Sequence, residues 1–313
     1  MMHSIYIGLN NPGQEQKLSD ILQNRYPNYE IVLSTQLKND LQLKHCQGAI
    51  IWKNDPNHLL NMPNLKLIQC MGAGVDFIDW SLPQYRSVPV CRFVDPSLSV
   101  QLAQYVIGYI LSDKLEFDGY RALQDEKNWQ QREPRAGSKV LILGLGAIGS
   151  RIASLLQQMD FQIYSWSTTL KGTELIHEMT TQDELSAVLP DIDYVVNLLP
   201  STPKTTNFIN ESFLLDMKAD ACVINVGRGE SLDTEALISF LDQKKIRKAI
   251  LDVFKQEPLP SSDKLWEHPS VLLTPHIAAQ SSLEAVASVF SRNLEKITCG
   301  KAPEFQVDPD KGY

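Results

Sequence analysis

A glycine-rich turn is the clearest chemical signal in the chain. The segment KVLILGLGAIGSRIASLLQQ carries Gly144, Gly146 and Gly149 in G-x-G-x-x-G spacing, directly after an apolar strand pattern and at the start of an amphipathic helix pattern. These glycines would allow a tight turn, a close approach of the backbone to a pyrophosphate, and close packing of helix on sheet. Free N–H groups at the positive helix end, where Ala147 and Ile148 lie, would bind the pyrophosphate. The turn therefore predicts a dinucleotide site.

The next strand pattern, FQIYSWSTTLKG, lacks the acid that usually binds the cofactor ribose about 20 residues after the first glycine. No acid occurs before Glu174. A carboxylate there would repel the 2′-phosphate of NADP, whereas this chain offers hydroxyl groups and one cation: Ser167, Thr168, Thr169 and Lys171. The sequence therefore predicts a preference for NADP(H). Because the segment has no arginine, a relaxed site that also takes NAD(H) stays open as the alternative.

Three further reactive side chains follow the ends of later strand patterns. Arg228 lies between two glycines in INVGRGE, Glu257 follows LDVFKQ, and His276 follows Thr–Pro in LLTPHIAAQ. Each residue alone has an ordinary explanation as a surface charge or a turn residue. In open α/β sheets, however, ligands bind beyond the carboxyl ends of the strands. Because the three residues close successive strands of one sheet, we expect them at one site.

Short apolar runs alternate with helical patterns along the chain, which predicts parallel sheets covered by helices. The first series of strand patterns covers residues 4–10, 30–35, 48–53, 65–71 and 88–93. The second covers 139–144, 161–167, 193–200, 221–227, 248–254 and 271–277, and its continuous apolar character is typical of strands buried on both faces. A long helical pattern at 95–123, with Pro96–Ser97 as its start signal, and a polar connector at 125–138 separate the series. We therefore expect an α/β chain with two doubly wound units.

Composition limits the classes of function. The chain has 313 residues, enough for about two domains, and its net charge of −8 argues against a nucleic-acid partner. Its five cysteines are scattered without a CxxC pair, which suits a reducing cytosol and predicts no metal site. The start of the chain has no signal-peptide pattern, and no apolar run approaches the roughly 18 residues of a membrane helix. We expect a cytoplasmic protein without a membrane partner.

Taken together, these motifs resemble a known family. GAGVD (residues 72–76), GLGAIG, NVGRG, LDVFKQEPLP and TPHIAA occur in the order and spacing of the D-isomer-specific 2-hydroxyacid dehydrogenases, over essentially the whole chain. Within the family, the resemblance is greatest to the glyoxylate/hydroxypyruvate reductase A group, on AIIWK, the WS after the second strand, and the tail VDPDKGY. The resemblance implies a Rossmann cofactor domain at 99–281, inserted into a flavodoxin-like substrate domain at 1–98 plus 282–313. It also implies a cleft between these domains and a homodimer supported by the long helix.

The resemblance implies roles for the reactive residues. Arg228 would bind the substrate carboxylate and polarise the keto oxygen through its planar fork of donors. His276 would give a proton to that oxygen as hydride arrives, and Glu257 would orient His276 and favour its protonated form. Asp252 would meet the nicotinamide side of the cofactor. The family's other expected cofactor contacts are at strand ends: Leu199, Pro200, Thr205, Val226 and Gly227.

The substrate is expected to meet the first half of the chain too. Backbone N–H groups around Ala73 and Gly74 would hold its carboxylate, and Trp52 would shape a pocket for a small polar keto acid, unless it is an ordinary core residue. The chain departs from the reductase A group at Thr168 and Leu170, where those relatives carry arginines, so only Lys171 keeps a positive charge there. The phosphate of NADP could therefore be bound more weakly than in those relatives.

The implied activity is NADPH-dependent reduction of a small 2-keto acid, with glyoxylate and hydroxypyruvate as the leading substrates. Two alternatives stay open on the sequence. One is a dehydrogenase of a bulkier D-2-hydroxy acid. The other is a non-catalytic protein that senses a dinucleotide and recruits partners, against which the set Arg228, Glu257 and His276 argues without deciding.

Overall fold

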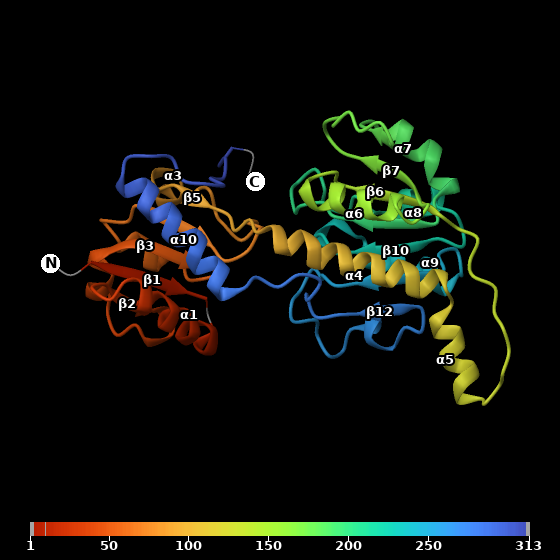
Figure 1. Cartoon of the computed structure of the whole chain (residues 1–313), viewed down its shortest axis with the longest axis horizontal. Helices are drawn as coiled ribbons and strands as arrows, with labels where there is room; N and C mark the ends of the chain where they lie inside the picture. The colour runs from red at the N-terminus through yellow and green to blue at the C-terminus, as the bar shows by residue number, and fades with distance from the viewer. Residues whose placement is uncertain (1–2, 10, 311–313) are drawn as a thin grey trace. The chain divides into compact units, whose positions relative to one another are not determined.

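The computed structural model describes residues 3–9 and 11–310. The chain divides into two compact units, Met1–Pro96 with Ser281–Tyr313, and Ser97–Gln280. The second unit is therefore inserted into the first. The elements of both units are labelled in Figure 1.

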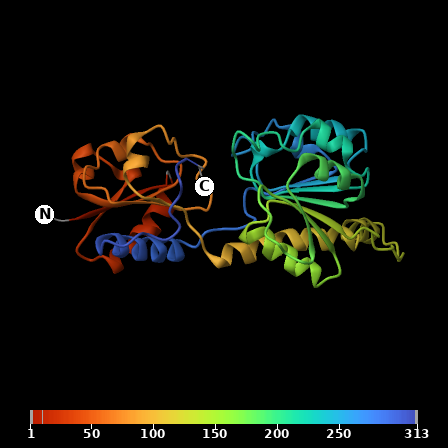
Figure 2. The same ribbon diagram turned by 90° about the horizontal axis from the view of Figure 1, so that it is seen from above.

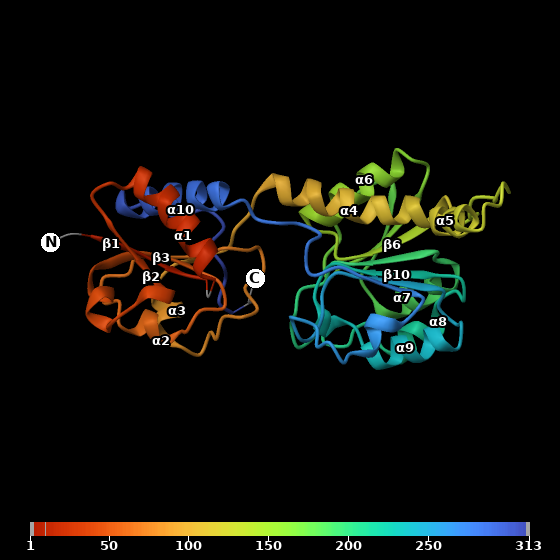
Figure 3. The same cartoon turned by 90° about the horizontal axis from the view of Figure 1, so that it is seen from below.

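The first unit is a five-stranded parallel sheet covered by helices on both faces. Its strands lie in the order β2-β1-β3-β4-β5, which is the flavodoxin-like order. Helices α1 and α10 pack side by side on one face and α2 and α3 lie on the other, as Figure 3 shows. The strands are β1 (Ser4–Gly8), β2 (Glu30–Leu33), β3 (Cys46–Ile51), β4 (Leu67–Cys70) and β5 (Val90–Cys91). The helices are α1 (Pro12–Arg25), η1 (Ser34–Gln36), η2 (Asp40–His45), α2 (Asn57–Leu60), α3 (Pro83–Ser87) and α10 (Leu283–Thr298).

The second unit is a seven-stranded parallel sheet in the order β12-β11-β10-β9-β6-β7-β8. The strand order reverses between β6 and β9, the position where doubly wound sheets bind dinucleotides. The strands are β6 (Lys139–Leu143), β7 (Gln162–Trp166), β8 (Ile176–Met179), β9 (Tyr194–Asn197), β10 (Cys222–Asn225), β11 (Lys248–Leu251) and β12 (Val271–Leu273). The helices are α4 (Pro96–Lys114), α5 (Phe117–Asp125), α6 (Ala147–Gln157), α7 (Gln182–Val188), η3 (Leu189–Asp191), α8 (Glu211–Asp216), η4 (Gly229–Ser231), α9 (Thr234–Asp242) and η5 (Lys264–Glu267).

Alternate residues of the central strands enter two different cores. In β6, Leu141 and Leu143 belong to one buried cluster, and Val140 and Ile142 belong to the other. Helices α4 and α6 cover one face of this sheet, and α7, α8 and α9 cover the opposite face (Figures 2 and 3). Burial on both faces explains the nearly continuous apolar sequence of these strands. The carboxyl ends of the strands are thereby fixed along one edge, where loops can carry reactive groups.

The predicted α/β class with two doubly wound parallel sheets is confirmed, and each of the eleven predicted strand patterns overlaps an observed strand. Two details of the sequence interpretation were wrong. The helical pattern at 95–123 begins at Pro96 as predicted but forms two helices, because Glu116 adopts a left-handed backbone with φ of 60°. Strand β8 was not predicted, since its sequence IHEM is short, polar and at the sheet edge.

Candidate active site

The glycine turn has the geometry that a dinucleotide requires. Gly144 has a φ of +103°, a backbone conformation that side chains disfavour, directly after β6. A Cβ on Gly149 would come within 2.3 Å of the Gly144 carbonyl oxygen, so only glycine lets α6 start this close to the strand. At Gly146 a Cβ would meet nothing within 4 Å, and no side chain caps the helix there. The turn therefore fits a pyrophosphate, with Ala147 and Ile148 opening the helix toward it.

The structure brings Glu257 and His276 together. His276 Nδ1 lies 2.9 Å from Glu257 Oε2, and Glu257 Oε1 accepts a hydrogen bond from the Phe254 N–H at 3.1 Å. A carboxylate can only accept, so the imidazole proton on this side belongs to Nδ1. The glutamate is held by its own loop while it orients the ring. The other nitrogen, Nε2, is thereby left as the ring atom that can exchange a proton with a ligand, on a side chain that is 41% exposed.

Asp252 is engaged with the backbone around His276. Its buried carboxylate accepts hydrogen bonds from the Thr274 hydroxyl at 2.6 Å, from Ile277 N–H at 2.8 Å and from Ala278 N–H at 2.9 Å. The His276 N–H donates to the Asp252 carbonyl oxygen at 2.9 Å. Asp252 therefore links the end of β11 to the loop after β12. The sequence could not indicate this task, and the predicted contact with a nicotinamide stays a prediction.

Arg228 follows β10 and is half-buried. Its carbonyl oxygen accepts hydrogen bonds from Asn225 Nδ2 at 3.1 Å and from the Ser231 hydroxyl at 2.6 Å, and Asn197 Nδ2 donates to Ser231 Oγ at 2.6 Å. These buried polar residues fix the backbone from which the guanidinium extends. The sequence interpretation did not include them, although Asn225 is the first residue of the NVGRG motif and Ser231 lies two residues after it.

The predicted cofactor contacts at the neighbouring strand ends are packed closely together. A Cβ on Gly227 would lie 2.8 Å from the Leu199 carbonyl oxygen, so glycine is required where these two loops meet. The Thr205 hydroxyl donates to the Pro200 carbonyl oxygen at 2.5 Å and closes the loop after β9. Leu199 and Val226 are buried beside it. The loops after β9 and β10 therefore pack tightly against each other, with mostly apolar side chains between them.

The segment after β7 is bonded to an acid on β8 that the sequence interpretation missed. The Glu178 carboxylate, from β8, accepts hydrogen bonds from the backbone N–H groups of Lys171 and Thr173, the latter at 2.7 Å. These bonds lower the pKa of Glu178, with the one from Lys171 N–H contributing most. The Ser167 hydroxyl donates to the Thr169 carbonyl oxygen at 2.8 Å. The side chains of Thr168, Thr169 and Lys171 are exposed, and their contact with a phosphate stays a prediction.

In the first unit, Trp52 lies against the GAGVD turn. A Cβ on Gly72 would come within 2.5 Å of the indole ring, and the ring packs edge-on to Phe77 with centroids 5.2 Å apart. Trp52 follows β3 and Gly72 follows β4, so both are at the carboxyl edge of this sheet. The indole is only partly buried, and Ala73 and Gly74 are on the same turn. The indole ring therefore lies beside the predicted carboxylate-binding loop, and its role in shaping a substrate pocket stays a prediction.

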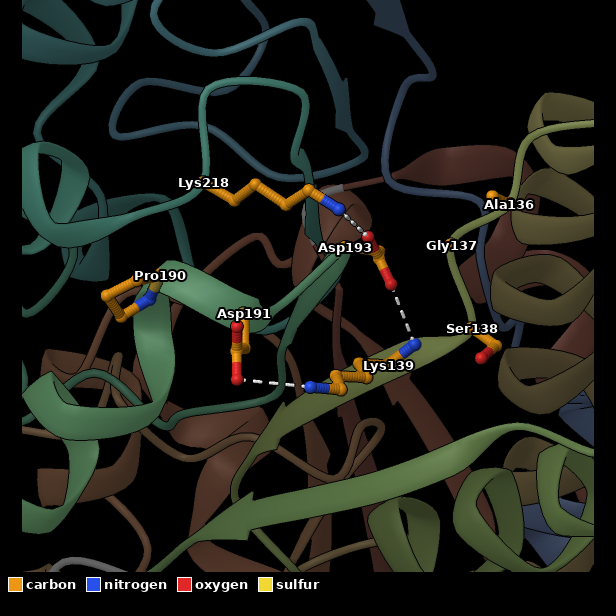
Figure 4. Close-up of a pocket in the computed structure, with 8 residues that line it drawn as sticks. All are labelled: Ala136, Gly137, Ser138, Lys139, Pro190, Asp191, Asp193 and Lys218. Carbon is orange, nitrogen blue, oxygen red and sulfur yellow. Dashed lines mark hydrogen bonds and ion pairs between the residues drawn. The ribbon is translucent and has the colours of Figure 1, made fainter.

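A pocket at the opposite edge of the large sheet does not resemble a ligand site. Figure 4 shows its charged side chains paired with one another. Asp193 accepts from Lys218 Nζ at 2.6 Å and from Lys139 N–H at 2.9 Å, and Lys139 Nζ donates to Asp191 at 3.1 Å. Lys139 begins β6 and Asp193 precedes β9, so the pocket lies at the amino ends of the strands. Its other lining residues are Ala136, Gly137, Ser138 and Pro190.

Residues 3–9 and 11–310 contain no group of three or more His, Cys, Asp and Glu side chains that could hold a metal ion. Among the helices of the same residues, none is both long and apolar enough to cross a membrane.

The fold and the carboxyl-edge residues define a class: a dinucleotide-binding enzyme of the Rossmann type, with a histidine–carboxylate pair on its strand-end loops. Comparison with known proteins specifies that class. Residues 107–278 match the family model described as "D-isomer specific 2-hydroxyacid dehydrogenase, NAD binding domain". The chain belongs to the D-isomer-specific 2-hydroxyacid dehydrogenase family, a family of NAD(P)-dependent oxidoreductases, as its motifs predicted.

Individual relatives agree with this assignment. The chain is 34% identical to glyoxylate/hydroxypyruvate reductase A of Yersinia enterocolitica over 275 residues, which covers 85% of this chain and 87% of that protein. It is similar to the NADPH-dependent glyoxylate/hydroxypyruvate reductase of Sinorhizobium meliloti, solved with NADP and sulfate, with a TM-score of 0.89, 29% identity and coverage of 99% and 100%. A family member from Xanthobacter autotrophicus, solved with NADPH and MES, gives a TM-score of 0.87, 30% identity and coverage of 99% of each chain.

Proposed function

We propose that this protein catalyses the NADPH-dependent reduction of small 2-keto acids, converting glyoxylate to glycolate and hydroxypyruvate to D-glycerate. The observation that carries the proposal is the 2.9 Å contact between His276 Nδ1 and Glu257 Oε2, with the glutamate itself anchored by Phe254 N–H. This pair gives an imidazole a fixed orientation and a nearby negative charge, which are the requirements of a proton donor to a keto oxygen. Relatives with reductase names and NADP-bound structures support the reaction.

The reaction needs one hydride and one proton. When bound, the reduced nicotinamide supplies the hydride to the carbonyl carbon of the keto acid. His276 gives the proton on Nε2 to the carbonyl oxygen, while Nδ1–H stays donated to Glu257. Arg228 binds the substrate carboxylate with two parallel donors and polarises the keto oxygen. The products are the 2-hydroxy acid, the oxidised cofactor and a neutral histidine, which regains its proton from water.

Residues of the first unit are proposed to set the size of the substrate. Ala73 and Gly74 offer backbone N–H groups to the carboxylate, and Trp52 limits the space next to them. The close approach of the indole to Gly72 supports this role, because the ring is fixed beside the turn and only partly buried. A pocket bounded by a fixed tryptophan favours glyoxylate and hydroxypyruvate over a bulky keto acid.

The cofactor preference is proposed to be NADP(H) over NAD(H). Support comes from the exposed side chains of Thr168 and Lys171 and from the absence of an acid between Tyr164 and Ser167. Glu178 weakens this argument, because its carboxylate takes the Lys171 and Thr173 N–H groups that a phosphate could otherwise use. We therefore expect the preference to be smaller than a dedicated arginine clamp would give.

The proposed assembly is a homodimer that covers α5 and the connector after it. Figure 1 shows α5 and this connector extending from the sheet of their own unit. Their apolar side chains are exposed: Phe117 by 55%, Tyr120 by 39% and Trp129 by 103%. Exposed aromatic groups gathered on one projecting segment are typical of an interface. Sedimentation velocity of the wild type and of Trp129→Ala tests the assembly; a wild-type monomer would contradict it.

The proposed compartment is the cytoplasm. The cysteines Cys46, Cys70, Cys91 and Cys222 are buried free thiols, and burial raises the pKa of Cys46 and Cys222 to about 12. Cysteines that form no disulfide suit a reducing compartment. Fractionation of cells that express the full chain checks this proposal.

A steady-state panel tests the reaction. NADPH and NADH would each be combined with glyoxylate, hydroxypyruvate, pyruvate and phenylpyruvate, and kcat/KM would be measured from the loss of reduced-cofactor absorbance. We expect the two smallest polar keto acids with NADPH to give the highest values. A preference for phenylpyruvate would instead assign a bulkier D-2-hydroxy acid, and dinucleotide binding without turnover of any keto acid would assign a sensing protein.

A further inference from the structure

The backbone of His276 is in a conformation that ordinary residues avoid. Its φ is 54°, in the left-handed region that only a few per cent of non-glycine residues adopt. Such conformations persist only where neighbouring groups hold them, and they concentrate at functional sites. The residues 274–280, which we call the histidine loop, must therefore be held by contacts from outside the loop. The catalytic role that we assign to those contacts rests on the proposed function.

Asp252 holds the centre of the histidine loop. Its carboxylate accepts the N–H groups of Ile277 and Ala278, the two residues after the left-handed position, at 2.8 and 2.9 Å. Its carbonyl oxygen accepts the N–H of His276 at 2.9 Å. Three consecutive backbone donors are thus satisfied by one residue that is 1% exposed. The strained turn that aims the imidazole is fixed as long as this carboxylate is fixed.

A hydrogen-bond chain fixes the carboxylate from α4. The Thr274 hydroxyl lies 2.6 Å from Asp252 Oδ1 and 2.5 Å from the Tyr105 hydroxyl. Thr274 has one hydroxyl proton, and a carboxylate only accepts, so that proton points to Asp252. Tyr105 must then donate to Thr274. Burial raises the pKa of the Tyr105 phenol, so the phenol keeps the proton that the chain requires.

The same helix holds the other end of the histidine loop. Gln101 Nε2 donates to the Gln280 carbonyl oxygen at 3.3 Å, and Gln280 N–H donates to Gln101 Oε1 at 3.1 Å. Gln101 and Tyr105 are four residues apart on α4 and so lie on one helix face. Hydrogen bonds from α4 therefore hold the histidine loop at both of its ends, Thr274 and Gln280.

We propose that Tyr105 and Thr274 are positioning residues of the keto-acid reduction, which act through Asp252 to hold the His276 turn in the orientation for proton transfer. Neither side chain needs to touch the substrate. Their hydrogen bonds fix the direction of the Asp252 carboxylate, and this carboxylate fixes the turn. Since a small displacement of a proton donor lowers the rate steeply, loss of the chain lowers kcat while cofactor binding is kept.

Thr274→Val is the main test, because it keeps the shape of the side chain and removes only the hydroxyl. We expect kcat for glyoxylate reduction with NADPH to fall about tenfold, the loss expected for one hydrogen bond to a charged group. The Kd for NADPH, measured by nucleotide fluorescence, should not change. Thr274→Ser restores the hydroxyl and should restore kcat. An unchanged kcat in Thr274→Val would overturn the proposal.

A double-mutant cycle shows whether Tyr105 acts through Thr274. Tyr105→Phe alone should lower kcat about threefold, because Thr274 keeps its bond to Asp252 but loses the donor that orients it. On the Thr274→Val background the same change should have no effect on kcat. Additive losses would show that Tyr105 acts by another route, against the proposal. Tyr194→Phe is the matched control, since it removes a buried phenol that donates to Asp113 at the amino edge of the sheet, and it should leave kcat unchanged.

Hydrogen exchange gives a readout that does not depend on turnover. The Ile277 and Ala278 amides should exchange faster in Thr274→Val than in the wild type, whereas the amides of α4 should not change. Equal protection of the two loop amides in the variant and the wild type would overturn the positioning role even if kcat fell. If the wild type reduced none of the keto acids, the proposed function would fail, and the exchange experiment would still decide whether Tyr105 and Thr274 hold the loop.

Discussion

The two edges of the seven-stranded sheet use charge in opposite ways. At the amino edge, Asp113 on α4 binds Arg247 through both oxygens, with Arg247 Nη2 at 2.8 Å, and accepts the Tyr194 hydroxyl at 3.0 Å. Its side chain is only 5% exposed. At the carboxyl edge, the His276 side chain is 41% exposed, and the structure holds it by one ring nitrogen.

The difference shows how a structural charge can be separated from a functional one. At the amino edge each charged group satisfies another, and the result is a closed network that links helix and strands. At the carboxyl edge, the buried Asp252 carboxylate accepts hydrogen bonds from backbone N–H groups of the loop that carries His276. The His276 side chain itself stays partly exposed to solvent. Removal of an amino-edge charge should therefore cost stability, and removal of a carboxyl-edge charge should cost activity.

The largest expected effect is at Arg228. Arg228→Met removes the proposed bidentate contact to the substrate carboxylate, worth about 4 kcal/mol, so kcat/KM for glyoxylate should fall about a thousandfold. Arg228→Lys keeps the positive charge but lacks the planar fork of donors, so its kcat/KM should lie between those of the wild type and Arg228→Met. The melting temperature should stay close to that of the wild type. A kcat/KM within tenfold of the wild-type value would remove Arg228 from substrate binding.

Asp113 should show the opposite pattern. Asp113→Ala leaves Arg247 without its main partner in a buried site, and we expect the free energy of unfolding to fall by about 3 kcal/mol. Urea denaturation followed by circular dichroism measures this loss. Below the transition, kcat should equal that of the wild type. Asp118→Ala is the control, because Asp118 pairs with Lys248 but is 73% exposed, and its loss should cost under about 1 kcal/mol.

Glu257 should have a smaller catalytic effect than Arg228. Glu257→Gln keeps an oxygen acceptor for His276 Nδ1 but removes the negative charge beside the imidazole. We expect kcat to fall about tenfold, with little change in KM for NADPH. Glu267→Gln, an exposed acid of the same unit, should have no effect. Equal kcat values for the two variants would exclude a role for the Glu257 charge.

The smallest effect is expected in the amino-edge pocket of Figure 4. Lys218→Met breaks the ion pair with Asp193, but the lysine side chain is 44% exposed and Asp193 keeps the Lys139 N–H. The free energy of unfolding should change by less than about 1 kcal/mol, and kcat should not change. A loss of activity in Lys218→Met would show that this pocket takes part in function and would break the contrast between the two edges.

Much of this arrangement could be predicted from local sequence. The G-x-G-x-x-G turn combines a strand pattern, a helix pattern and three glycines within a short segment, and Gly144 and Gly149 are glycines for the steric reasons expected. The strand ends that carry Arg228, Glu257 and His276 could be located because the strands before them are nearly continuous in apolar residues.

Other features depend on contacts between distant segments. Glu178 was missed because β8 is a short polar edge strand, and the acid reaches the loop after β7 only through strand pairing. The partners of Asp252 were missed because they lie 22 to 26 residues away in sequence. The helix break at Glu116 was missed too, since the helical pattern continues through it. Local patterns predict where loops begin, whereas tertiary hydrogen bonds decide how the loops are held.

The most direct test of the proposed chemistry is single-turnover reduction of glyoxylate by His276→Ala loaded with NADPH. We predict that the rate of NADPH oxidation falls about a thousandfold, because the proton donor is gone, and that the Kd for NADPH stays at the wild-type value. His45→Ala, at an exposed histidine of the first unit, should react at the wild-type rate. A His276→Ala rate equal to that of the wild type would contradict the account.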